Sequence, residues 1–195
     1  MIASTAQHIA IAGRLYAAEA FLWSMLEIEV KAPAPDLAAV EARLLSMHAD
    51  GPHEEVQVDT YFAHPARDFG ATDEALRLRR QKGRTILTYK GPKLDQKTKT
   101  REEIEVDVPD ADAMALILTK VGFSIALEVR KVRREYLLPD AVVCLDRVAG
   151  LGDYVEVEYR TQDLEKGRER VAEIMTSLGL QGNERRSYLE LLMLQ

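Results

Sequence analysis

Charged and aliphatic side chains alternate strictly along the stretch Leu26-Glu27-Ile28-Glu29-Val30-Lys31. This alternation predicts a β-strand, because successive side chains of a strand point to opposite faces of the sheet. Glu27, Glu29 and Lys31 therefore share one face, and the aliphatic residues share the other. For one strand alone, the simplest interpretation is a charged face turned to solvent.

The same period of two recurs in four further stretches, which makes a shared charged surface the more economical interpretation. These stretches are Leu76-Arg77-Leu78-Arg79, residues 101–106, 131–136 and 155–158. Intervening helical segments offer cover for the aliphatic faces. The pattern therefore predicts an α+β fold: a closed, eight-stranded antiparallel β-barrel with a charged lumen and with helices packed outside.

The expected element boundaries follow from the same periodicity and from turn and cap residues. Strands are expected at residues 26–31, 56–62, 75–80, 84–90, 100–108, 124–137, 142–147 and 153–159. Helices are expected at residues 36–49, 110–121, 163–178 and 184–193.

Composition limits the classes of protein that this chain can belong to. With 195 residues and 47% hydrophobic content, it can bury the core of one domain. A net charge of −6 argues against nonspecific nucleic-acid binding, which requires a basic face. A single cysteine, Cys144, excludes an internal disulfide, and no Cys/His cluster has zinc spacing, so the cytoplasm is the expected location.

The first 24 residues are rich in alanine and aliphatic side chains but are interrupted by polar ones, including Arg14 and Glu19. These interruptions argue against a membrane span. We expect residues 1–24 to form an amphipathic helical extension that is dispensable for a domain of residues 25–195. Translation is expected to begin at Met25, and deletion of the extension tests this.

A series of motifs carries a resemblance to a known family. They are Glu27-x-Glu29-x-Lys31, Asp59-Thr60-Tyr61-Phe62, Leu76-Arg77-Leu78-Arg79, Leu87-Thr88-Tyr89-Lys90-Gly91-Pro92, Thr100-Arg101-Glu102-Glu103-Ile104-Glu105, Lys131-x-Arg133, Leu145-Asp146 and Glu156-x-Glu158. Together they resemble the CYTH superfamily of triphosphate tunnel metalloenzymes, which includes class IV adenylyl cyclases and thiamine triphosphatases. The resemblance spans residues 26–192. It is strongest to class IV adenylyl cyclases, through residues 87–92 and 150–152.

The basic residues of the predicted lumen suit a triphosphate. Stripping such a ligand of water requires cations in place of the lost solvation, and arginine can donate two hydrogen bonds to one phosphate group. For any single basic residue, a solvated charge or a structural salt bridge is the simpler interpretation. The recurrence of such residues on the same face of several strands favours a binding site. The candidates are Arg77, Arg79, Lys90, Arg101, Lys131 and Arg133, with Lys99 added from a polar loop.

Carboxylates in a phosphate site indicate a divalent cation, because Mg²⁺ or Mn²⁺ prefers oxygen ligands and bridges carboxylates to phosphates. The candidate ligands are Glu27, Glu29, Glu156 and Glu158, and the resemblance implies the same four. Three further acidic residues hold a second ion or orient the basic side chains: Glu103, Glu105 and Asp146.

The resemblance also implies catalytic residues. In triphosphatases of this superfamily a lysine and a tyrosine activate water, and Lys31 and Tyr61 occupy the matching positions. Where those hydrolases have Tyr-Tyr-Asp, this chain has Tyr61-Phe62-Ala63, which argues against a thiamine triphosphatase.

The sequence alone leaves three functions open. The leading hypothesis is a metal-dependent enzyme that converts ATP to 3′,5′-cyclic AMP and pyrophosphate. The alternatives are a triphosphatase acting on tripolyphosphate, thiamine triphosphate or nucleoside triphosphates, and a noncatalytic triphosphate sensor. Resemblance to class IV cyclases also implies a homodimer, whereas neither nucleic acid nor a membrane is an expected partner.

Overall fold

The computed structural model of the chain describes residues 26–93 and 101–195. The predictions for residues 1–24, for Lys99 and for the side chain of Glu27 lie outside the described part. Within that part, no helix is long and apolar enough to cross a membrane.

The strands form one sheet in which every hydrogen-bonded pair is antiparallel. The strand order is β1-β8-β7-β6-β2-β3-β4-β5. The strands are β1 (Leu26–Pro33), β2 (Asp50–Ala63), β3 (Ala75–Gln81), β4 (Arg84–Lys93), β5 (Arg101–Asp107), β6 (Ser124–Leu137), β7 (Ala141–Val148) and β8 (Gly152–Thr161). The predicted fold class is confirmed, including the number of strands.

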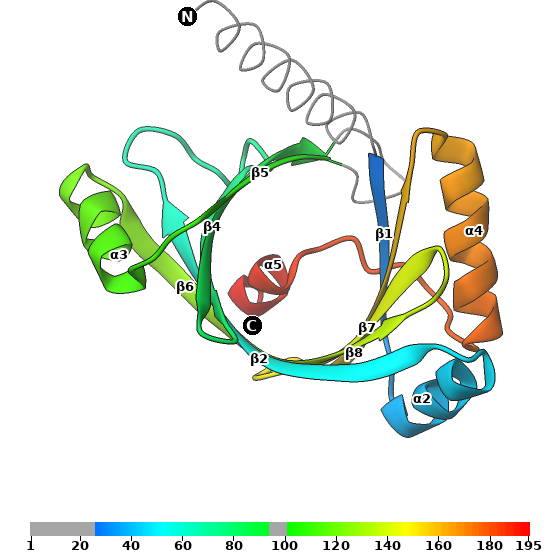
Figure 1. Cartoon of the computed structure of the whole chain (residues 1–195). Helices are drawn as coiled ribbons and strands as arrows, with labels where there is room; N and C mark the ends of the chain where they lie inside the picture. The colour runs from blue at the N-terminus through cyan, green and yellow to red at the C-terminus, as the bar shows by residue number, and fades with distance from the viewer. Residues whose placement is uncertain (1–25, 94–100) are drawn as a thin grey trace, which may run out of the picture.

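The sheet curls around a central space because adjacent strands of a twisted sheet rotate relative to one another (Figure 1). Its two edges are β1 and β5, and no ladder between them occurs in residues 26–93 and 101–195. The predicted closed barrel is therefore a curled sheet with a seam at its two edge strands.

Two helices cover the outer, aliphatic face of β1, β8 and β7. They are α2 (Leu37–Ser46), capped by Asp36, and α4 (Leu164–Ser177), capped by Asp163. They enclose the larger apolar core, which includes Ile28 and Val157. Gly167 allows α4 to lie close to β1, because a Cβ at this position would be 2.1 Å from Cδ1 of Ile28.

Helix α3 (Ala111–Lys120), capped by Asp110, packs on the outside of the opposite wall, against β3 and β6. Its contacts form a smaller core that includes Phe62, Leu78 and Leu118. Figure 1 shows α3 at the left of the curled sheet and α2 and α4 at its right, all three outside the curve.

The fourth described helix, α5 (Tyr188–Met193), lies within the curve of the sheet (Figure 1). The prediction that helices pack outside is therefore wrong for this element. Tyr188 packs with Tyr61, Val129 and Val148, which form an apolar cluster. Helix α5 shields this apolar cluster from water on the concave side of the sheet.

β2 and β4 extend past residues that normally interrupt strands, because irregularities in their pairing absorb these residues. β2 begins at Asp50, six residues early, and its register with β6 shifts between Asp50 and His53 around Gly51-Pro52. Gly51 has φ 142°, and a Cβ there would lie 2.7 Å from the Glu135 carbonyl oxygen. β4 likewise runs past Gly91-Pro92, where its register with β5 shifts.

Candidate active site

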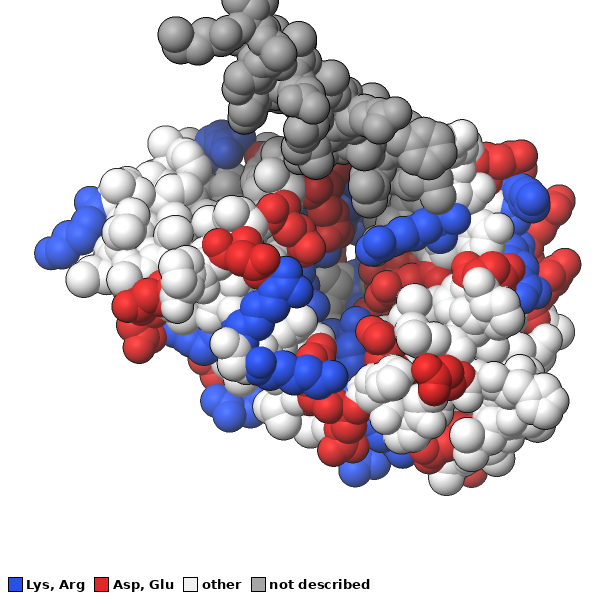
Figure 2. All heavy atoms as spheres, viewed as in Figure 1, with Lys and Arg blue, Asp and Glu red and all other residues white. Residues whose placement is uncertain are grey.

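The concave side of the sheet encloses a cavity of about 1140 Å³. Acidic and basic side chains gather around the central hollow (Figure 2). Of the sixteen predicted site residues, thirteen line this cavity: Glu29, Lys31, Tyr61, Arg77, Arg79, Lys90, Arg101, Glu103, Glu105, Lys131, Arg133, Glu156 and Glu158. The alternating pattern therefore places these charged side chains inward.

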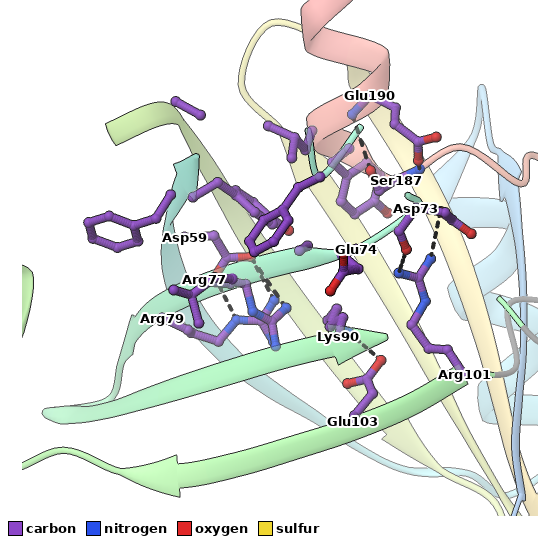
Figure 3. Close-up of a pocket in the computed structure, with 18 of the residues that line it drawn as sticks. Asp59, Asp73, Glu74, Arg77, Arg79, Lys90, Arg101, Glu103, Ser187 and Glu190 are labelled. Carbon is purple, nitrogen blue, oxygen red and sulfur yellow. Dashed lines mark hydrogen bonds and ion pairs between the residues drawn. The ribbon is translucent and has the colours of Figure 1, made fainter. Parts of the chain in front are cut away.

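Asp59 anchors two of the candidate phosphate-binding arginines. Its carboxylate is buried and accepts hydrogen bonds from Nε and Nη2 of Arg79 at 2.6 and 2.7 Å. Nη1 of Arg77 lies 3.7 Å from Asp59, and Nη2 of Arg77 donates to Oγ1 of Thr88 at 3.2 Å. Burial alone would raise the pKa of Asp59, but the hydrogen bonds from Arg79 and the charge of Arg77 hold that pKa well below its usual range. One carboxylate therefore fixes two guanidinium groups at the cavity wall (Figure 3).

Asp146 has the same role for the basic residues of β6. It is fully buried and accepts hydrogen bonds from Nε and Nη2 of Arg133 at 2.7 and 2.6 Å. Nζ of Lys131 donates to it at 3.1 Å, and Arg133 also donates to Glu156. Burial, together with the charge of Arg133, lowers the pKa of Lys131. These contacts are compatible with the predicted role of Asp146 in orienting basic side chains, which stays a prediction.

A third group of ion pairs lies on β4 and β5 (Figure 3). Lys90 donates to Glu103, and burial lowers the pKa of Lys90. Burial alone would raise the pKa of Glu103, but the charge and hydrogen bond of Lys90, together with the charges of Arg77 and Arg101, lower that pKa. Arg101 lies 3.7 Å from Oδ1 of Asp73, which also accepts a hydrogen bond from Nζ of Lys93 at 2.6 Å. Each candidate phosphate ligand on these strands is thus near a carboxylate.

The two candidate catalytic residues lie in different parts of the wall. Nζ of Lys31 on β1 donates to the carbonyl oxygen of Arg186 at 2.5 Å and lies 4.0 Å from the centre of the Tyr188 ring. Tyr61 on β2 lies opposite Arg77 in the β2–β3 register. Burial raises the pKa of Tyr61, so its hydroxyl stays protonated and can donate a hydrogen bond.

The candidate metal ligands of the two terminal strands face each other. Glu29 lies directly opposite Glu158, and both line the cavity. Opposed like charges destabilise a strand pair, and Nη1 of Arg133, 3.7 Å from Oε1 of Glu158, offsets part of this repulsion; a bound divalent cation would offset it further. Across the described residues, however, no three acidic, histidine or cysteine side chains are already gathered around one point.

The donor chemistry nevertheless fits a hard divalent cation. Eleven acidic and nine basic side chains from the described residues line the cavity, so a bare polyanion would meet a net negative wall. Oxygen ligands from Glu29 and Glu158, with Glu156 next to them, suit Mg²⁺ or Mn²⁺ after a movement of these side chains. Glu105 lies 3.6 Å from Nη2 of Arg77 and accepts a hydrogen bond from Thr88, so it supports the basic wall in this structure.

Four further residues contact the candidate site or its ion pairs and were not predicted as site residues: Asp59, Asp73, Lys93 and Tyr188. Asp59 had a usable signal, since it alternates with Tyr61 and must share its face. Lys93 lies beyond Gly91-Pro92, which concealed the end of β4. Neither the contact of Asp73 nor that of Tyr188 has a local sequence signal, because both depend on how loops return to the sheet.

A curled antiparallel sheet around a cavity of paired acidic and basic side chains is the architecture of a triphosphate tunnel enzyme. The chain belongs to the CYTH domain family, which it matches over residues 25–188. Enzymes of this family are metal-dependent adenylate cyclases or triphosphatases, and the chain is an enzyme of this class.

Several relatives cover nearly the same length. A Methanocaldococcus jannaschii protein, MJ0240, whose name proposes an adenylate cyclase, is 39% identical over 86% of this chain and 98% of its own. Adenylate cyclase CyaB of Aeromonas hydrophila is 29% identical over 83% of this chain and 86% of its own. The structure of PH1819 from Pyrococcus horikoshii superposes with a TM-score of 0.78 at 40% identity, covering 86% of this chain and 98% of its own.

Proposed function

We propose that this enzyme is a metal-dependent adenylyl cyclase that converts ATP to 3′,5′-cyclic AMP and pyrophosphate. The observation that carries the proposal is the convergence of basic side chains from β3, β4, β5 and β6 on a cavity that also holds the opposed pair Glu29 and Glu158. The names of MJ0240 and CyaB support cyclisation over hydrolysis.

The chain's own residues divide into three roles in this proposal. Cationic side chains bind the phosphate oxygens and stabilise charge on the departing pyrophosphate; they are Arg77, Arg79, Lys90, Arg101, Lys131 and Arg133, together with Lys99. A divalent cation held by Glu27, Glu29, Glu156 and Glu158 would neutralise phosphate charge. The supporting acids Glu103, Glu105 and Asp146 hold the basic groups in place.

The reaction forms one bond and breaks one. The ribose 3′-oxygen forms a bond to the α-phosphorus, and the bond from that phosphorus to the bridging oxygen of pyrophosphate breaks. The 3′-hydroxyl proton must leave during attack, and we propose that it passes to water in the cavity while the Lys31 ammonium and the Tyr61 hydroxyl position the reacting oxygens. The protonated Tyr61 hydroxyl orients a reacting oxygen as a hydrogen-bond donor.

A product assay tests the proposal. Purified protein is incubated with ATP and Mg²⁺ or Mn²⁺, and nucleotides are separated by anion-exchange chromatography. Cyclic AMP with an equal amount of pyrophosphate is the expected result. ADP with orthophosphate, or turnover of tripolyphosphate alone, would assign the chain to the triphosphatases; binding without any turnover would indicate a sensor.

Arg77→Ala should remove most of the activity, and Arg84→Ala provides the matched control. Arg84 also pairs with a carboxylate, that of Asp107, but both side chains are exposed on the outside. Loss of activity in both variants would show a general effect on folding and not a role at the site.

We also propose that the enzyme acts in the cytoplasm as a homodimer, as the class IV cyclases imply. Light scattering coupled to size-exclusion chromatography tests the dimer. A monomer at micromolar concentration would contradict it.

A further inference from the structure

The segment that precedes α5, residues 184–187, contacts the first strand, β1, at Lys31. The backbone N–H of Glu184 donates to the carbonyl oxygen of Lys31 at 2.6 Å, and the carbonyl oxygen of Arg186 accepts from Nζ of Lys31 at 2.5 Å. Two backbone groups of this segment thus hold one candidate catalytic residue.

A capping box then fixes the start of α5. The Ser187 hydroxyl accepts from the N–H of Glu190 at 3.1 Å, and the Glu190 carboxylate accepts from the N–H of Ser187 at 2.6 Å. Tyr188 is the first residue of the helix, so these reciprocal bonds determine where its side chain points.

The side chain of Tyr188 contacts three ionisable groups of the site. Nζ of Lys31 lies 4.0 Å from the ring centre, and Nζ of Lys131 lies 4.9 Å from it. The Tyr188 hydroxyl donates to Oδ2 of Asp146 at 3.0 Å, beside the bonds that Asp146 accepts from Arg133. Tyr188 itself is 6% exposed, so water competes little for any of these contacts.

We propose that Tyr188 is a positioning residue of the triphosphate site: its ring seats the ammonium groups of Lys31 and Lys131, and its hydroxyl completes the set of donors that fixes Asp146. The inference concerns the site of the proposed function and extends it to the C-terminal helix. No part of it requires Tyr188 to touch the substrate.

The ring and the hydroxyl act by different physical means. The face of an aromatic ring attracts a cation, and more strongly where water is excluded. The hydroxyl donates a hydrogen bond to an ionised group, and such bonds are stronger than those between neutral groups. Burial raises the pKa of Tyr188, so the hydroxyl keeps the proton that it donates.

Two substitutions separate these contributions. Tyr188→Phe keeps the ring and removes the hydroxyl, whereas Tyr188→Leu removes both. The matched control is Tyr136→Phe, which deletes another buried tyrosine hydroxyl, one that donates to Glu41 in the outer core. Neither Tyr136 nor Glu41 lines the cavity.

The readout is affinity for a probe that does not turn over: a tripolyphosphate analogue with methylene bridges, titrated calorimetrically with Mg²⁺ present. Tyr188→Phe should weaken binding about ten-fold, the equivalent of one charge-assisted hydrogen bond, and Tyr188→Leu about a hundred-fold. Tyr188→Phe should therefore bind the probe about ten-fold more tightly than Tyr188→Leu. Tyr136→Phe should bind as the wild type does.

Affinity equal to wild type in both Tyr188 variants would overturn the inference, and so would failure of the wild type to bind the probe. If Tyr188→Leu does not fold, the test is the probe affinity of the near-isosteric Tyr188→Phe, compared with the affinities of the wild type and of Tyr136→Phe. Absence of cyclic AMP from the wild type would remove the proposed function but leave this affinity series, and therefore the inference, intact.

Discussion

Replacing Asp59 with asparagine tests how strongly the basic wall depends on its internal carboxylates. The amide keeps the shape of the side chain, but it removes the charge that accepts two hydrogen bonds from Arg79 and lies 3.7 Å from Arg77. Breaking a buried ion pair in this way costs about 3–5 kcal/mol, because the remaining charges stay buried without compensation. In a domain of this size, that loss lowers the midpoint of thermal unfolding by about 6–20 °C.

Circular dichroism melts, with and without the methylene analogue and Mg²⁺, provide the assay. A ligand at a hundred times its dissociation constant stabilises the folded state by about 2.7 kcal/mol. Since phosphate oxygens replace the lost carboxylate, the ligand-induced rise of the midpoint should be larger for Asp59→Asn than for wild type.

The control is Asp107→Asn, which removes a carboxylate bound to Arg84 at 2.5 and 2.8 Å with both partners exposed. Water screens that pair, so the midpoint should hardly move. The reasoning fails if the two substitutions lower the midpoint equally, or if the ligand stabilises Asp59→Asn less than wild type.

Three further results are expected. The free energy of unfolding should fall as the pH drops below about 4, because Asp59 and Asp146 have lowered pKa values when folded and their stabilisation is lost as they protonate; urea melts between pH 5 and 2 that show constant stability would contradict this. Glu156→Gln should weaken Mg²⁺ binding about ten-fold in calorimetry with the fold intact, and an unchanged isotherm would remove Glu156 from the ligand set. Chelation of divalent ions should abolish product formation and re-addition of Mg²⁺ should restore it; persistent turnover in excess EDTA would refute a metal requirement.

The period of two predicted both the fold and the inward direction of the charged side chains. Arg77 and Arg79 illustrate why: a strand allows only two directions, so the apolar partners Leu76 and Leu78 determine which face is buried in the outer core. Likewise, Asp36, Asp110 and Asp163 are the observed caps of the helices that they were expected to start.

The pairing of these charges could not be read from the sequence in the same way. Asp59 meets Arg79 only because β2 and β3 align with that register. Asp73 meets Lys93 because a loop with Asp73 at φ 55° returns beside a strand that continues past a proline. The sequence predicted a helix at residues 184–193 but placed it outside the sheet, because the inner apolar cluster of Tyr61, Val129 and Val148 forms only when three separate strands meet.

The distribution of carboxylates around the cavity has a consequence for which phosphates the enzyme retains. Asp59, Asp146 and Glu103 each bind a different group of cations, so an incoming anion must largely exchange partners with these carboxylates. A single orthophosphate reaches too few of these groups to compensate for such an exchange, whereas a linear chain of phosphates engages several at once. We therefore expect the site to bind a chain of phosphates more tightly than a single orthophosphate.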